Sequence, residues 1–595
     1  MPAPAAARTP ALAAVVLGAK LLTVSLRIAD GAAGGLFSFW APLALIHQDL
    51  WLIILFGVTE AGAAAAARAR PALAPAARLA MTVSYAFIVV WVAVNVPVAR
   101  LFATPATFAF LHATGGALGD SARGFVTPAN VAAPLVIVAL GFALGLRPLP
   151  PPFRLMPGVG LTMMAVVALA GAPATAHVAT LGLHRNAVIT LARTTAAHYL
   201  PARSSLIEIS DAACAPAEGA ARDLRDLRGA ARGRNVVWVI LESTAARFLA
   251  PYGAARDATP NLTALSRDAV LFEAAYAAYP ESIKSFFSML CARRPLAGRE
   301  ASELGAGATA CEPLPALLAG AGYRTALLHS GRFAYLGMKT VVADRGFQRL
   351  EDGATVGGAF SSSFGVDEPA TVRRLLSFVD GLQAGERFFA VYMPIAGHHP
   401  YHAPGQGPRP FVERVPADAY ANDLFVGDAA FGLLRDGLRA RGLDQRTLYV
   451  LVGDHGEAFL EHEGNFAHSL FLYEENVRVP LLIAAPGLTR GTRRAPQLAS
   501  AVDVAPTILD LLGLPSAALH EGRSLLDPAP RLVSFFTDQG VPQAALREGR
   551  WKFIDDHESG RAQLFDLSTD PGERRNLATA DPARVQRYRA CLASR

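Results

Sequence analysis

The chain has 595 residues, of which 52% are apolar and only 17% are charged, and its net charge at pH 7 is +6. Soluble domains carry about 25% charged residues, so this composition argues against a wholly soluble protein. The small net charge, with no basic stripe interleaved with aromatic residues, argues against a nucleic-acid-binding protein. Charged residues are scarce up to about position 200 and ordinary afterwards, which predicts a membrane half joined to a soluble half.

The membrane half contains five apolar segments that are long enough to cross a bilayer, which takes about 20 residues. They cover about 10–28, 36–64, 79–99, 130–146 and 155–177. Lys20 interrupts the first segment, and further segments follow it. We therefore expect a retained anchor rather than a cleaved signal peptide.

Arginine residues are unevenly distributed among the loops that join these segments. With the N-terminus in the cytoplasm, the cytoplasmic loops carry Arg8, Arg68, Arg70, Arg78, Arg147 and Arg154. This bias follows the positive-inside rule and predicts that orientation. Five spans then place the rest of the chain outside the cytoplasm, whereas a miscount of one span reverses the placement.

The chain after the fifth segment divides into a linker and a soluble domain. We expect a transmembrane domain at 1–177, a linker with membrane-proximal helices at 178–234 and a soluble domain at 235–595, with a C-terminal subdomain at about 530–595. In the soluble domain, short apolar runs alternate with helical segments. Runs that are buried on both faces and separated by helices predict a mostly parallel sheet with flanking helices.

Acidic and imidazole residues follow four of the predicted strands. Glu242, His329 and His398 each end one apolar run, and Asp454 and His455 end another. Ligands of open α/β sheets bind outside the carboxyl ends of the strands, so we expect these side chains to converge. Each residue alone has a structural explanation, such as an acid at a helix N-terminus or a turn cap. Together, carboxylate oxygens and imidazole nitrogens favour a site for a divalent metal ion.

A serine stands at the predicted start of a helix in "SIKSFFSML". Ser282 could be an ordinary N-cap. As a nucleophile, its hydroxyl would face the positive end of the helix dipole, and a nearby metal ion would lower its pKa further. Lys284 is a candidate phosphate contact, with a solvated surface charge as the alternative.

Four cysteines, Cys214, Cys291, Cys311 and Cys591, form neither a CxxC motif nor a zinc spacing. An even count in an extracytoplasmic domain permits two disulfides. Cys291 and Cys311 flank one short loop, so we expect them to pair, which leaves Cys214 with Cys591. Four buried thiols are the alternative.

The motifs between Asn235 and Leu577 resemble the sulfatase branch of the alkaline phosphatase superfamily. They include "NVVWVILES", "LVGDHGEAFLEHEG", "LYEENVRVPLLIAAPG", "AVDVAPTILDLLGLP" and "QLFDLSTDPGERRNL". The resemblance implies an α/β domain with a mostly parallel central sheet and a small C-terminal α+β subdomain, joined here to an all-α polytopic membrane domain of about five transmembrane helices.

The nucleophile loop departs from the sulfatase pattern. Sulfatases resemble one another in a Cys- or Ser-x-Pro-x-Arg motif, whose first residue is converted to formylglycine. Here Ser282 is followed by the four residues Ile-Lys-Ser-Phe, and Glu242-Ser243 stands where sulfatases have paired aspartates. These departures resemble the membrane-anchored transferases of the same branch, the lipoteichoic acid synthases and phosphoethanolamine transferases, whose usual nucleophile is threonine.

The resemblance to these transferases implies a set of roles. Ser282 is the nucleophile, and Glu242, Ser282, Asp454 and His455 hold one divalent ion, zinc or manganese. His398 and His468 match positions that contact the phosphate and assist proton transfer, while His329 and Arg332 are further candidates for substrate contact.

The function implied is metal-dependent transfer of phosphoglycerol or phosphoethanolamine from a membrane phospholipid to a hydroxyl group of an envelope glycan or lipid. The group would pass through a covalent phosphoserine-type intermediate. A sulfate ester on unmodified serine would be a dead end, whereas a phosphoserine ester can pass its group on. We expect a bacterial cytoplasmic membrane protein with an extracytoplasmic catalytic domain. The alternatives are a hydrolase of sulfuric esters or phosphodiesters, and a non-catalytic lipid-binding or regulatory protein.

Overall fold

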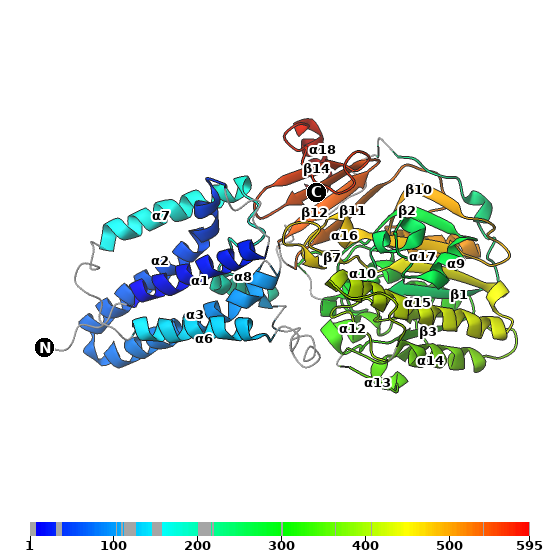
Figure 1. Cartoon of the computed structure of the whole chain (residues 1–595), viewed down its shortest axis with the longest axis horizontal. Helices are drawn as coiled ribbons and strands as arrows, with labels where there is room; N and C mark the ends of the chain where they lie inside the picture. The colour runs from blue at the N-terminus through cyan, green and yellow to red at the C-terminus, as the bar shows by residue number, and fades with distance from the viewer. Residues whose placement is uncertain are drawn as a thin grey trace.

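The computed structural model describes residues 8–30, 38–102, 104–108, 111, 126–145, 157–199, 216, 219–298, 301–362, 364–405, 407–539 and 541–593. A bundle of N-terminal helices lies at one end of a larger α/β domain (Figure 1).

Apolar helices form the bundle, namely α1 (Thr9–Ala29), α2 (Ala41–Ala69), α3 (Ala74–Phe102), α6 (Pro128–Gly145) and α7 (Pro157–Ala174). Among the described residues, α1, α2, α3 and α6 are long and apolar enough to cross a membrane. Helix α7 is also apolar and has 18 residues, as many as α6, and it packs along α2. Gly171 permits this contact, because a Cβ atom there would lie 2.2 Å from the Cβ of His47. Four of the five expected spans are therefore confirmed by length and composition, and α7 is a fifth apolar helix close to the expected position.

The α/β domain is built on an eight-stranded sheet with the order β10-β2-β9-β6-β1-β5-β3-β4. Its strands are β1 (Asn235–Leu241), β2 (Val270–Tyr276), β3 (Tyr323–His329), β4 (Arg349–Glu351), β5 (Arg387–Met393), β6 (Thr447–Gly453), β9 (Arg478–Ala484) and β10 (Arg493–Ser500). Only β9 runs antiparallel to its neighbours. The predicted mostly parallel sheet is confirmed.

Helices cover both faces of this sheet, because side chains alternate between the faces along each strand. Trp238 of β1 packs in one core with α10 (Ser282–Cys291) and α17 (Val504–Leu512). Val237 and Val239 pack in a second core with α14 (Glu368–Asp380) and α15 (Pro416–Ala440). The smaller helices are α9 (Pro260–Ser266), α11 (Leu314–Gly320), α12 (Met338–Val342), α13 (Gly353–Val356) and α16 (Glu474–Val477).

A four-stranded antiparallel sheet forms the expected C-terminal subdomain. Its strands are β11 (Leu532–Thr537), β12 (Gln543–Glu548), β13 (Trp551–Asp556) and β14 (Ala562–Asp566), and helix α18 (Pro582–Ala593) packs on them. Cys291, at the end of α10, is bonded to Cys311. Cys214 lies outside the described residues, so its expected pairing with Cys591 stays a prediction.

Two parts of the chain join the bundle to the α/β domain. Helix α8 (Ala187–Tyr199) packs on α3, and the turn before it carries Arg185, whose Nε donates to Glu558 at 2.8 Å. A short hairpin, β7 (Ala458–Phe459) with β8 (Phe466–Ala467), reaches α1, where a Cβ atom on Gly464 would lie 2.2 Å from Nη2 of Arg27.

Candidate active site

Ser282 is the first residue of helix α10, but it is not the residue that caps the helix. The cap is Glu281, whose carboxylate accepts from the backbone N–H groups of Ile283 at 3.0 Å and Lys284 at 3.1 Å. The alternative interpretation of Ser282 as an ordinary N-cap is therefore wrong, because the cap is the residue before it. Because Glu281 satisfies these backbone donors, the Ser282 hydroxyl is available for other contacts.

The Ser282 hydroxyl contacts residues from two neighbouring strands. Its Oγ lies 3.1 Å from both carboxylate oxygens of Glu242 and 3.1 Å from Nε2 of His455. Strands β1 and β6 pair in parallel as far as Leu241 and Gly453, so Glu242 and Asp454 follow side by side. The structure thus brings together the four residues expected to bind metal, Glu242, Ser282, Asp454 and His455.

Asp454 shows that this cluster suits a cation. Its Oδ1 accepts from the backbone N–H of Ser243 at 2.8 Å and of His455 at 2.7 Å. Its Oδ2 is buried and has no hydrogen-bond partner among the described residues. Ligand atoms of Glu242, Asp454 and His455 all lie within 4.8 Å of one another. Three buried metal-ligand side chains, one of them with an unsatisfied carboxylate oxygen, fit a divalent ion.

Electrostatics support the same conclusion. Burial raises the pKa of Asp454 to about 7, and burial together with repulsion from Asp454 raises the pKa of Glu242. Burial lowers the pKa of His455 to about 4, so the imidazole is neutral and can donate its lone pair to a metal ion. Two buried carboxylates without a cation of their own are unfavourable, and a bound divalent ion would offset that charge.

His468 lies against the cluster and is held by a chain of buried hydrogen bonds. The ring centroids of His468 and His455 are 4.1 Å apart. Nδ1 of His468 lies 2.7 Å from Oε2 of Glu457, and the hydroxyl of Tyr401 donates to Oε1 of the same carboxylate at 2.5 Å. Sequence reasoning selected His468 but missed Glu457 and Tyr401. The signal for Glu457 was its place two residues after His455 in "GDHGE".

His398 completes the group of histidines. Its ring centroid lies 5.9 Å from that of His468 and 4.5 Å from that of Phe364. The backbone before it passes close to Glu242, because a Cβ atom on Gly397 would lie 2.4 Å from the carbonyl oxygen of Glu242. Gly397 has φ +109°, which also favours glycine. The loop after β5 therefore brings His398 to the edge of the candidate metal site.

Lys284 is placed differently from the sequence prediction. Its Nζ lies 3.0 Å from Oδ1 of Asp538 and 3.3 Å from the hydroxyl of Tyr279, and the side chain is buried. This ion pair links α10 to the segment that follows β11 in the C-terminal subdomain. The predicted phosphate contact of Lys284 is thus replaced by a structural role.

His329 and Arg332 also lack a direct place in the cluster. Nδ1 of His329 lies 3.1 Å from the carbonyl oxygen of Met393, its ring lies near Phe333, and burial lowers its pKa to about 4. Arg332 donates to the carbonyl oxygen of Ser362 at 3.2 Å. Nδ1 of His329 is therefore fixed to β5, and Arg332 holds the segment that leads to Phe364. The substrate contacts expected of both residues stay predictions.

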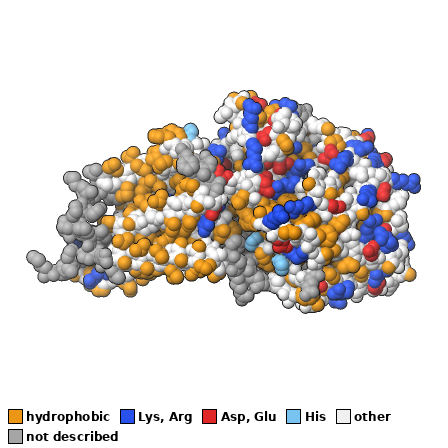
Figure 2. Space-filling model, in the orientation of Figure 1, with side chains coloured by type: hydrophobic (Ala, Val, Ile, Leu, Met, Phe, Trp, Pro, Cys, Tyr) orange, Lys and Arg blue, Asp and Glu red, His pale blue; other side chains and the backbone are white. Residues whose placement is uncertain are grey.

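The site lies on the side of the α/β domain that faces the helical bundle. Figure 1 shows β7 and α10 on this side, and Figure 2 shows histidine side chains close to the boundary with the bundle. The hairpin that touches α1 at Gly464 leads directly into His468. The hairpin thus places His468 on the side of the domain that faces the bundle.

Comparison with known proteins agrees with this architecture. The sulfatase family model matches residues 234–514. Arylsulfatase K of Rattus norvegicus is 35% identical over 174 residues, which are 26% of this chain and 30% of that protein. Choline-sulfatase of Rhizobium meliloti (strain 1021) is 36% identical over 175 residues, 27% of this chain and 32% of that protein. The chain thus spans about a third of the length of the curated relatives it matches.

Two solved structures share the fold. The lipoteichoic acid synthase LtaP from Listeria monocytogenes superposes with a TM-score of 0.52 at 17% identity, over 63% of this chain and 94% of that one. BT1596, a 2-O GAG sulfatase, superposes with a TM-score of 0.51 at 18% identity, over 60% of this chain and 91% of that one. At such low identity these likenesses show the fold alone. Together with the family match over residues 234–514, the shared fold supports a sulfatase-like α/β domain in this chain.

Proposed function

We propose that the protein transfers a phospho-alcohol group, phosphoglycerol or phosphoethanolamine, from a membrane phospholipid to a hydroxyl group of an envelope glycan or lipid. The observation that carries this proposal is a plain serine hydroxyl 3.1 Å from both Glu242 and His455. The residues after Ser282 lack the proline and arginine of the formylglycine motif, so an unmodified serine is the nucleophile. An unmodified serine can accept a phosphoryl group and pass it on, whereas a sulfate ester on such a serine would be a dead end.

Glu242, Asp454, His455 and Ser282 would hold one divalent ion, zinc or manganese. When bound, the ion supplies positive charge that favours the serine alkoxide and the phosphate oxygens. The Ser282 oxygen attacks phosphorus, and the bond from phosphorus to the lipid alcohol breaks, which releases diacylglycerol. The proton of the serine hydroxyl passes through His468 to the departing alkoxide, while His398 contacts the phosphate.

The second half of the reaction reverses these steps with a different alcohol. The acceptor hydroxyl attacks the phosphoserine, and the bond between phosphorus and the Ser282 oxygen breaks. The acceptor proton returns through His468 to the serine oxygen, which restores the enzyme. The hydrogen bond of His468 to Glu457 at 2.7 Å would hold the ring in place for both transfers.

The membrane half supports a lipid donor. The candidate site faces the end of the bundle, and four apolar helices are long enough to cross a bilayer. With the N-terminus inside and α7 as the fifth crossing, the α/β domain lies on the extracytoplasmic side of a bacterial cytoplasmic membrane. In that place a phospholipid donor and an envelope acceptor are both within reach.

Hydrolysis of sulfuric esters is the second candidate, and the named relatives favour it. Arylsulfatase K and choline-sulfatase are among the curated proteins that this chain resembles in sequence. In that case Ser282 would be converted to formylglycine, and water would take the place of the acceptor. The same cluster of Glu242, Asp454 and His455 would serve either reaction.

One experiment separates the two candidates. The purified full chain is incubated with phosphatidylglycerol or phosphatidylethanolamine labelled in the head group, and its mass is measured before and after. We expect the head-group phosphate to become attached to Ser282 and diacylglycerol to be released. Ser282→Ala should form no adduct, and Ser282→Thr, which keeps a hydroxyl, should form one. Formylglycine at position 282, or turnover of an aryl sulfate without lipid labelling, would instead establish the sulfatase.

A further inference from the structure

The segment 394–403, which follows β5, supplies two side chains to the candidate active site and forms neither a helix nor a strand. His398 lies near its middle, and Tyr401 donates to the carboxylate of Glu457 at 2.5 Å. The same carboxylate lies 2.7 Å from Nδ1 of His468. The position of this segment, here called the histidine loop, therefore affects both His398 and His468.

Asp423 of α15 holds the histidine loop at two points. Its Oδ2 accepts from the backbone N–H of Gly397 at 2.7 Å, directly before His398. Its Oδ1 accepts from the backbone N–H of Ala403 at 2.8 Å, two residues after Tyr401. The Asp423 side chain is completely buried. One carboxylate thus fixes the two ends of the stretch that carries both active-site side chains.

Glu368 of α14 holds the start of the same loop. Its Oε1 accepts from the backbone N–H groups of Ile395 at 2.7 Å and Ala396 at 3.0 Å. Its Oε2 accepts from the hydroxyl groups of Tyr392 and Ser330, each at 2.6 Å. Four donors from β5, from the residue after β3 and from the histidine loop therefore meet at one buried carboxylate.

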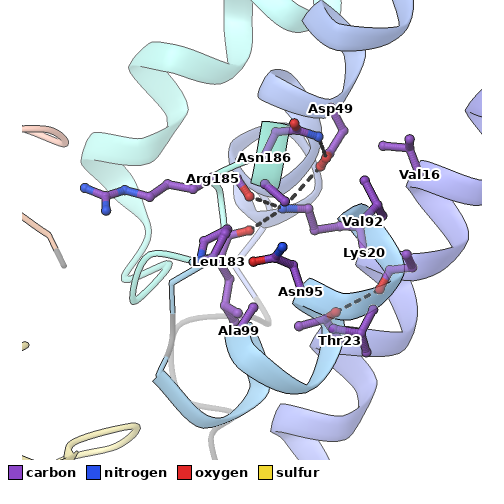
Figure 3. A pocket seen from close by; sticks show the side chains of 14 residues that line it. Val16, Lys20, Thr23, Asp49, Val92, Asn95, Ala99, Leu183, Arg185 and Asn186 are labelled. Atoms are coloured by element: carbon purple, nitrogen blue, oxygen red, sulfur yellow. Dashed lines mark hydrogen bonds and ion pairs between the residues drawn. The ribbon is translucent and has the colours of Figure 1, made fainter. Parts of the chain in front are cut away.

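A buried acid of the helical bundle shows what these two carboxylates lack. Asp49 lies 3.2 Å from Nζ of Lys20, as a dashed line in Figure 3 shows. Glu368 has no cation as a partner among the described residues, and Nη1 of Arg409 lies 3.9 Å from Asp423, beyond hydrogen-bonding distance. Burial raises the pKa of both carboxyl groups. Burying an acid without a close cation is unfavourable, so the contacts that it makes with the loop are its evident role.

The histidine loop has a backbone conformation that needs such support. Gly397 has φ +109°, and Tyr401 has φ +63°, which residues with a side chain rarely adopt. Gly397 also lies so close to the carbonyl oxygen of Glu242 that a Cβ atom would lie 2.4 Å from it. A small shift of the loop would therefore change the place of His398 relative to Glu242.

We propose that Asp423 and Glu368 are positioning residues, which hold the histidine loop so that His398 and His468 are in place for the reaction at Ser282. The proposal rests on the roles proposed above for the two histidines. Among the described residues, neither carboxylate forms a hydrogen bond to Ser282 or to a candidate metal ligand. Their effect on the rate therefore passes through the loop.

The first test compares Asp423→Asn with Asp428→Asn in the purified full chain with its metal ion. In Asp423→Asn an amide NH2 faces one of the two loop N–H groups, which loses its acceptor. Asp428 is the matched control, because this buried carboxylate of the same helix accepts from the backbone N–H groups of Asn261 at 2.8 Å and Leu262 at 2.9 Å, at the start of α9. A misplacement of about 1 Å can cost about 100-fold, so we expect kcat/KM to fall by about 10- to 100-fold in Asp423→Asn and by less than about threefold in Asp428→Asn. Both variants should keep the metal content of the parent protein.

Hydrogen exchange followed by mass spectrometry tests the loop without any substrate. Peptides from 394–403 should exchange slowly in the parent protein and in Asp428→Asn, and at least about tenfold faster in Asp423→Asn. Rapid exchange of this segment in the parent protein would overturn the proposal, even if Asp423→Asn fails to fold.

A double-mutant cycle separates positioning from general damage to the fold. In a background of His398→Ala with Tyr401→Phe, which removes both side chains that the loop supplies, Asp423→Asn should lower kcat/KM by less than about threefold. Glu368→Gln should cost less than Asp423→Asn, because its carbonyl oxygen can accept from the two backbone N–H groups and its NH2 can donate to the two hydroxyl groups. Equal losses from Asp423→Asn in the two backgrounds, or loss of metal in Asp423→Asn, would overturn the proposal.

The rates are measured as release of diacylglycerol from phosphatidylglycerol and of sulfate from an aryl sulfate. Turnover of the sulfate ester alone would contradict the proposed transfer, and the same cycle would then be measured on that ester. Failure of the proposed function is thereby distinguished from failure of the positioning role.

Discussion

Three clusters of acidic and imidazole side chains lie among the described residues of the α/β domain, and two of them, which share no residue, balance their charges in opposite ways. One joins Glu242, Asp454 and His455, and the other joins His462, Glu475 and Glu573. By distance alone both could hold a metal ion, because ligand atoms within each cluster lie within 4.8 Å of one another. The partners of these atoms decide which cluster is a metal site.

The second cluster contains its own cations. Nδ1 of His462 lies 2.6 Å from a carboxylate oxygen of Glu475, and Nε2 lies 3.2 Å from the carbonyl oxygen of Glu573. Both oxygens can only accept, so both ring nitrogens carry protons. The buried Nζ of Lys552 lies 3.1 Å from Glu474 and 2.9 Å from Glu573. The first cluster has no such cation among the described residues, and it leaves Oδ2 of Asp454 unsatisfied.

Metal content gives the largest expected difference between the clusters. Glu242→Gln removes one expected ligand, and we expect metal affinity to fall by at least about 100-fold, because losing even an outer-shell partner costs 10- to 100-fold. The matched variant His462→Gln should bind as much zinc or manganese as the parent protein. Elemental analysis of the purified chains measures both.

The reverse result would exchange the assignments. If Glu242→Gln retained its metal and His462→Gln lost it, the second cluster would be the metal site. The place of Ser282 beside Glu242 would then need another explanation.

Stability should respond to the two clusters with opposite signs. Lys552→Met leaves Glu474 and Glu573 buried without their cation, so we expect it to destabilise the α/β domain by about 3–5 kcal/mol. Glu242→Gln removes one of two repelling buried carboxylates, so in chelator-treated protein it should be neutral or stabilising. Urea unfolding followed by tryptophan fluorescence measures both variants. Destabilisation of the chelator-treated protein by Glu242→Gln would show that its carboxylate is held by protein contacts rather than by an ion.

The first cluster was predictable because its residues end adjacent parallel strands. Glu242 follows β1 and Asp454 follows β6, and the pairing of these strands fixes their meeting point. The second cluster carries no such pattern. His462 lies on a hairpin, Glu475 on a four-residue helix and Glu573 in a loop about a hundred residues further along the chain. No periodicity relates these positions.

The sequence also did not predict the direction of two side chains in this segment. The segment at Ser282 predicted a helix correctly, but the cap is Glu281, and Lys284 turns to Asp538 in the C-terminal subdomain. Both contacts depend on how α10 packs against distant segments. In the membrane half, by contrast, hydropathy predicted all five apolar helices.

Replacing Glu457 should reduce catalysis less than replacing one of the three expected metal ligands. Glu457 contacts His468 and is expected to position that ring rather than to bind the metal ion. Glu457→Gln keeps the size of the side chain but weakens its hold on His468, so we expect kcat to fall by about 10- to 100-fold with little change in KM. Tyr401→Phe removes one hydrogen bond to the same carboxylate and should have a smaller effect. The measurement is steady-state release of diacylglycerol or, for a sulfatase, of sulfate. A rise in KM alone would place Glu457 in substrate binding instead.

The smallest expected effect is a pH dependence that belongs to the second cluster. Burial works against the charged form of His462, but the hydrogen bond and charge of Glu475, with Glu573 nearby, raise the pKa of His462. Because the folded pKa lies above the unfolded value of about 6.5, the stabilising contribution of His462 is fully present below that pH and disappears as pH rises through the folded pKa. The difference in unfolding free energy between the parent protein and His462→Gln should therefore be larger at pH 6 than at pH 9. A constant difference across this range would mean that His462 acts through its stacking on Tyr473, at 3.7 Å between ring centroids, and not through its charge.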